Sequence, residues 1–82
     1  MSIRSYLYIA IKNRYISEMT EAKAVLEIYF NNPVGIGEHS QILEEMNKQL
    51  EKISSANGKL QQLHASFRRY EEVSSTPEKK SK

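Results

Sequence analysis

The side chains best suited to acid–base or metal chemistry are few and scattered along these 82 residues. The two histidines, His39 and His64, are 25 positions apart in different segments. Acidic residues adjoin twice, as Glu44-Glu45 and Glu71-Glu72, but neighbours on a helix point about 100° apart and do not converge on one reacting atom. There is no cysteine, which excludes a disulfide framework, a thiolate metal site and a cysteine nucleophile. We therefore predict no enzymatic activity, no catalytic or metal-ligating residues and no cofactor.

The segment Gly35-Ile36-Gly37 invites comparison with phosphate-binding loops, because glycines ahead of a helix can cradle an anion. It lacks the third glycine of a dinucleotide fingerprint and the Gly-Lys-Ser/Thr of a Walker loop. Pro33 disfavours helix at the residue before it, and the glycines can adopt positive φ. We predict that residues 31–40 form a connection between two helices.

Basic residues are the only indication of nucleic-acid binding. Arg68-Arg69 stands beside Tyr70, and three of the last four residues are lysines (Lys79, Lys80 and Lys82). A formal net charge of +2 for the chain is too small to indicate a nucleic-acid-binding protein. Residues 74–82 are polar, so we predict a disordered basic tail with weak, salt-sensitive attraction to polyanions and no specific nucleic-acid partner.

Residues 2–31 contain neither glycine nor proline and are predicted to form one helix with Ser2 as its N-cap. A strand over Tyr6–Ile11 would satisfy β-propensity, but the helical pattern continues unbroken beyond it. Spacings of three and four define one apolar face: Tyr8, Ile11, Tyr15, Met19, Ala22, Leu26 and Tyr29. Further apolar residues on other sides exceed what a two-helix contact requires, and we take these as candidates for partner binding: Tyr6, Leu7, Ile9 and Ile16.

Residues 41–73 carry the strongest pattern in the chain and are predicted to form the second helix. Two columns keep heptad spacing and are candidates for an oligomer interface: Leu43, Leu50, Asn57 and His64, and Met46, Ile53, Leu60 and Phe67. A third, largely apolar column widens the stripe: Ile42, Gln49, Ala56, Leu63 and Tyr70. The remaining flank lacks the alternating charges that select a parallel zipper. A bundle helix with more than one neighbour is therefore favoured, with a parallel dimeric coiled coil as the alternative.

Asn57-Gly58 is the weak point of the second helix, because this dipeptide is common in turns and glycine disfavours a helix interior. The heptad phase continues through it, which favours one continuous helix over two shorter ones. A polar residue such as Asn57 in an apolar column fixes register and partner number. His64, in the same column, is expected to be hydrogen-bonded within a helical interface.

Together these patterns predict an all-α fold in which residues 1–73 form an antiparallel hairpin of two long helices. A chain this short buries only roughly 60% of its unfolded surface, so we expect a dimeric or higher bundle. The longest apolar run, Tyr6–Ile11, is too short for a membrane span or a secretory signal. We expect no membrane insertion and a protein that stays in the compartment where it is made.

The connection Asn31-Asn32-Pro33-Val34-Gly35-Ile36-Gly37-Glu38-His39, followed by Glu44-Glu45, resembles the lysis-inhibition accessory proteins of T-even bacteriophages. The start Met-Ser-Ile-Arg-Ser-Tyr and the overall length agree with this resemblance, which covers most of the chain. It implies a non-enzymatic protein of the host cytoplasm that delays lysis by acting on the phage holin. The holin's short cytoplasmic N-terminal part would be the partner. The resemblance carries over no individual functional residue.

Two other classes agree with the same residues. A helical structural or assembly-associated phage protein would also use surplus apolar surface, and it is the first alternative. A nucleic-acid-binding accessory protein is the second. The sequence pattern leaves open the number of chains in the assembly and whether the long helices pair within or between chains.

Overall fold

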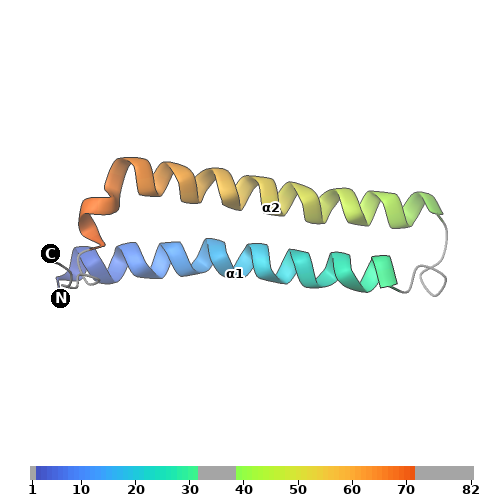
Figure 1. Cartoon of the computed structure of the whole chain (residues 1–82), viewed down its shortest axis with the longest axis horizontal. Coiled ribbons are helices and arrows are strands. Elements are labelled where there is room, and N and C mark those ends of the chain that lie inside the picture. Colours follow the sequence, from blue (N-terminus) through green and yellow to red (C-terminus); the bar gives the residue numbers. More distant parts are fainter. Residues whose placement is uncertain (1, 32–38, 72–82) are drawn as a thin grey trace, which may run out of the picture.

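The computed structural model describes residues 2–31 and 39–71. Helix α1 (Ile3–Asn31) and helix α2 (His39–Phe67) lie antiparallel, and a short 3-10 helix, η2 (Arg68–Tyr70), follows α2 (Figure 1). The described residues contain no strand, and the predicted all-α hairpin is confirmed. The Gly35-Ile36-Gly37 segment, the tail 74–82 and its lysines lie outside the described residues.

Ser2 is the N-cap of α1, as predicted. The backbone N–H of Ser5 donates to Ser2 Oγ at 3.2 Å, and the N–H of Tyr6 donates to the Ser2 carbonyl at 3.1 Å. The first bond satisfies an amide group that the first turn of a helix leaves without a partner, and the second is the first regular intrahelical hydrogen bond. The cap therefore fixes where α1 begins, and with it the first turns that face the end of α2.

The end of the second helix differs from the prediction. We expected helix to about residue 73, but α2 ends at Phe67, whose φ of −131° and ψ of 11° are not helical. After η2, the N–H of Glu71 donates to the Arg68 carbonyl at 2.9 Å. This turn brings Tyr70 and Glu71 to the first turns of α1, where they contact Arg4 and Lys12.

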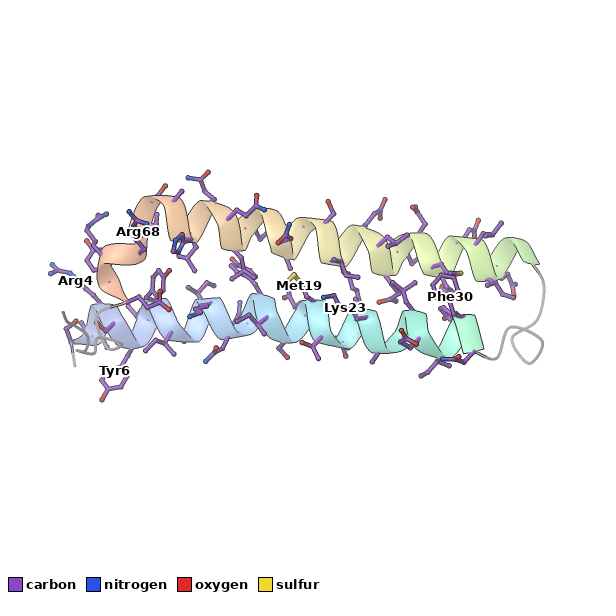
Figure 2. All side chains as sticks on the ribbon, in the orientation of Figure 1. Arg4, Tyr6, Met19, Lys23, Phe30 and Arg68 are labelled. Carbon is purple, nitrogen blue, oxygen red and sulfur yellow. The ribbon has the colours of Figure 1, made fainter. Side chains whose placement is uncertain are left out.

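The contact between the helices is a narrow strip. The apolar face predicted on α1 points inward, and Figure 2 shows Met19 directed toward α2. On α2 the third heptad column, rather than the first, lies closest to α1. The buried apolar residues are Tyr8, Ala22 and Leu26 of α1 with Ile42 and Ala56 of α2. This strip is the whole core of the described hairpin.

Helix α2 runs through Asn57-Gly58 without a break, which confirms the continuous helix. Gly58 is exposed, and a Cβ added there would meet no atom within 4 Å. The glycine therefore has no steric role in the hairpin.

We expect Gly58→Ala to raise the free energy of unfolding by about 1 kcal/mol, because alanine restricts the unfolded chain and fits the helix without strain. The thermal midpoint, followed by circular dichroism, should increase by about 4–8 °C for a domain of this size. A decrease would show that α2 bends at Gly58 in solution.

Gln49 is the one buried amide in the contact strip. It lies between Ile42 and Ala56 in the third column and is 8% exposed. Its Oε1 has no hydrogen-bond partner among the described residues. A buried carbonyl without a partner destabilises the folded state relative to the hydrated unfolded chain.

Gln49→Met keeps the length and helix propensity of the side chain while removing the unpaired oxygen. We expect it to raise the free energy of unfolding by about 1 kcal/mol, measured by urea denaturation. The exposed Gln41→Met serves as control and should change stability by less than about 0.5 kcal/mol. A loss of stability in Gln49→Met would mean that the amide is satisfied in solution.

Candidate functional site

An apolar hollow lies at the open end of the hairpin. There the first turns of α1 lie beside the end of α2 and η2 (Figure 1). The hollow has a volume of about 450 Å³. We call it the end groove, and its lining residues are Arg4, Leu7, Tyr8, Ile11, Leu63, Phe67 and Tyr70. All but Arg4 are apolar or aromatic, so the groove offers contact area for apolar groups.

Two aromatic rings, Phe67 and Tyr70, line the end groove together with the Arg4 guanidinium, and Arg69 contacts the same rings from outside the lining. The rings of Phe67 and Tyr70 stack with 6.4 Å between centroids and 16° between planes. The Arg69 guanidinium lies 4.5 Å from the Tyr70 centroid, and that of Arg4 lies 6.0 Å from it. Cations attract the negative face of an aromatic ring, so the Arg4 contact holds η2 against α1, whereas the Arg69 contact lies within η2.

Smaller hollows extend the groove along α1. One of about 240 Å³ includes Tyr15 and Lys59, and one of about 210 Å³ includes Leu7 and Arg14. Ile11 lines both of these and the end groove itself. The charged residues lining the three hollows are Arg4, Arg14 and Lys59, all of them cationic, with no carboxylate among the described lining residues. The surface is apolar with a positive rim.

The middle of the hairpin, on the same side as the end groove, is lined by charged and polar residues instead of apolar ones. A hollow there is lined by Glu18, Lys48, Glu51, Lys52 and Ser55, so charges of both signs alternate. Lys48 also pairs with Glu45 at 3.2 Å between Nζ and Oε2. Such exposed charges are hydrated and contribute little to stability. The apolar site is thus confined to the open end.

A second contact, an ion pair, also holds the open end of the hairpin together. Lys12 of α1 pairs with Glu71, the residue after η2, and both side chains are partly exposed. The two residues are 59 positions apart in sequence. The pair therefore ties the end of the described chain to the second and third turns of α1.

The four residues predicted to bind a partner do not form one surface. Leu7 lines the end groove, whereas Tyr6 points away from α2 (Figure 2). Ile9 and Ile16 are seven positions apart on one side of α1, and neither lines the groove. The structure brings Leu7 together with Phe67, which the sequence placed in a different set.

The predicted oligomer interface divides in the same way. Its second column is half-buried along the edge of the contact strip at Met46, Ile53 and Leu60. Its first column is exposed throughout, at Leu43, Leu50, Asn57 and His64. The histidine is therefore not enclosed within the hairpin, and this column remains available to another chain.

The groove residues that sequence reasoning did not single out are Arg4, Leu63 and Tyr70. Leu63 and Tyr70 belong to the third heptad column, so their apolar period was visible, but their place beside Leu7 depends on the turn after Phe67. Nothing in the sequence pattern marks Arg4 as a groove residue, because a single arginine near the start of a helix is common.

Comparison with protein-family models, with curated proteins and with solved structures gives no match to this chain. Neither described helix is apolar over enough of its length to cross a membrane. Within residues 2–31 and 39–71, no three His, Asp or Glu side chains are grouped so as to hold a metal ion.

Tyr70→Ala removes the ring that Phe67, Arg4 and Arg69 contact. We expect it to lower the free energy of unfolding by about 1–2 kcal/mol and to speed amide hydrogen exchange around residues 66–70. Tyr6→Ala, which removes an exposed ring at the same end, is the control and should change stability by less than about 0.5 kcal/mol. Equal effects would mean that η2 does not hold the groove together.

Proposed function

We propose that this chain is a non-enzymatic accessory protein that delays host lysis during a bacteriophage infection. It acts in the host cytoplasm and binds the short cytoplasmic N-terminal part of the phage holin in the end groove. The resemblance of residues 31–39 to the lysis-inhibition accessory proteins supports the biological role. The apolar, cation-rimmed end groove is the single structural observation that supports a peptide-binding mechanism.

The size and composition of the groove suit a short amphipathic segment. A volume of about 450 Å³ is within the range of about 300–1,000 Å³ typical of ligand sites. An amphipathic helix can place apolar anchors three or four positions apart into such a surface. Leu7, Ile11 and Leu63 offer the apolar contacts, and the rings of Phe67 and Tyr70 offer flat surface for packing.

The positive rim adds a requirement on the partner. Arg4, Arg14 and Lys59 line the groove and its extensions, so a bound segment with acidic residues beside its apolar ones is favoured. Rim charges act mainly on the rate of association and on its salt dependence. Apolar burial then supplies most of the affinity.

Two adjacent residues of α1, which point about 100° apart, provide a matched test. Leu7 lines the groove and is 63% exposed, whereas Tyr6 points away and is 58% exposed. We expect Leu7→Glu to weaken binding of a synthetic peptide of the holin N-terminal segment at least about 10-fold in calorimetry, because a carboxylate cannot be buried unpaired. Tyr6→Glu introduces the same charge and should bind as the wild type does.

The same pair of variants tests the biological role. In cells infected by a T-even phage that lacks its own lysis-inhibition accessory protein, we expect wild type and Tyr6→Glu to delay lysis and Leu7→Glu to fail. If Leu7→Glu binds the peptide normally while remaining helical, the end groove is not the site. If the wild-type chain neither binds the peptide nor delays lysis, the proposed function is wrong.

A further inference from the structure

The side of the hairpin opposite the end groove carries two columns of residues at heptad spacing. We propose that this side binds a second copy of the same chain and closes a four-helix bundle. We call it the heptad face, and it consists of Ile9, Ile16, Lys23 and Phe30 of α1 with Leu43, Leu50, Asn57 and His64 of α2. This homodimer goes beyond the proposed function and does not depend on it.

On α1, the buried Tyr8 separates the two sides of the hairpin. Leu7 and Ile9 adjoin it in sequence, so their side chains project about 100° to either side of the contact strip. Leu7 lies on the side of the end groove. Ile9 therefore lies on the opposite side, and Ile16, one heptad later, lies there too.

On α2, the same geometry applies around buried Gln49 and Ala56. Lys48 and Ser55, which precede them, line the hollow that also contains Glu18, on the same side as the end groove. Leu50 and Asn57, which follow them, therefore lie on the opposite side. Leu43 and His64 continue this column one heptad before and after.

The register of the hairpin sets the two columns side by side. Lys59 Nζ lies 5.4 Å from the Tyr15 ring centroid, so these positions are level across the antiparallel pair. Ile16 is then near the level of Asn57. Because both columns step by seven, Phe30 comes level with Leu43 at one end, and Ile9 with His64 at the other. Each heptad thus repeats the same pair of flanking positions.

The heptad face has the composition of an interface. Phe30, Leu43 and Leu50 are exposed by 54% or more, and Ile16 by 40%. Lys23 is the only lysine, arginine or acidic residue among its eight positions. Lys12 and Glu27 flank the face on α1, because they follow buried Tyr8 and Leu26 by four positions and by one. The charged residues that line the hollows of the opposite side are Arg4, Arg14, Glu18, Lys48, Glu51, Lys52 and Lys59. Large exposed apolar side chains with few charges among them are typical of the centre of a protein–protein contact.

The dimensions of the face favour a second copy over a short peptide. Each helix has 29 residues, which gives about 44 Å, and two adjacent helices of about 10 Å diameter present about 900 Å². A stable interface needs about 800 Å² from each partner. A partner must therefore match the whole length of the hairpin with the same heptad repeat. A second hairpin does so, because a two-fold axis places identical columns on both partners.

Leu50→Glu tests this interface directly. The wild type should elute with a light-scattering mass near 19 kDa, twice the 9.5 kDa of one chain. Leu50→Glu should raise the dissociation constant of the dimer at least about 100-fold, because each substitution occurs twice across a two-fold interface. Ile28→Glu is the control: Ile28 is 60% exposed, but it lies two positions after buried Leu26 and so faces away from α2. It should leave the dimer intact.

A second variant covers the case in which the separated hairpin does not stay folded. Asn57→Leu makes its column more apolar at the centre of the face. It should raise the thermal midpoint, and that midpoint should increase with protein concentration, as it does for a folded dimer. A wild-type mass of 9.5 kDa at about 100 µM, or an assembly that Leu50→Glu leaves unchanged, would overturn the dimer. Leu7→Glu, which alters the end groove, should keep the dimer mass, so failure of holin binding and failure of dimerisation can be distinguished.

Discussion

The whole structure depends on one narrow strip of contact between two antiparallel helices. A pair of helices can bury only the stripe of each that faces the other, so most of the surface stays exposed whatever the sequence. Here that stripe contains Ala22 and Ala56, which are almost fully buried, with Tyr8, Leu26 and Ile42 along it. Small residues allow close approach of the helices but bury little apolar area. The hairpin is therefore stabilised modestly by its own core.

The turn after Phe67 adds contacts at the open end, and these partly compensate for the small apolar area that the core buries. It returns Tyr70 to the first turn of α1, where Arg4 lies over the ring, and it places Glu71 beside Lys12. Both contacts join segments that are remote in sequence, and Tyr70 with Arg4 also lines the groove at this end of an otherwise flat pair of helices. The same turn thus contributes both to stability and to the shape of the candidate site.

The fold could be predicted from the sequence because its signals are local. Uninterrupted helical spacing over residues 2–31, the Ser2 cap and the Pro/Gly-containing connection each point to a hairpin without reference to the rest of the chain. The inward face of α1 could also be predicted, because Tyr8, Ala22 and Leu26 follow one period. None of these features depends on which face of one helix contacts which face of the other.

The orientation of α2 could not be predicted in the same way. Two of the three adjacent columns are largely apolar and the first is half apolar, so a rotation of α2 by one column leaves much of the apolar pattern satisfied. The third column faces α1 although it contains Gln49, and Leu50 is left outside. Their shared apolar character also grouped Leu7 with Ile9. Because they flank the buried Tyr8, their side chains lie on opposite sides of the contact strip. The end of α2 at Phe67 is marked by no glycine or proline among the following residues up to Pro77.

The end groove and the heptad face have different consequences because they lie on opposite sides of the thin hairpin. Closing the heptad face of each copy against the other would leave both end grooves open to solvent. A dimer so formed would present two identical groove sites on one rigid bundle. Two partner segments held near each other could then bind together, and the second contact would gain from the high effective concentration that the first creates. Weak burial within each hairpin, which would favour binding of a second copy, would in this way also make the modest groove part of a bivalent binding protein.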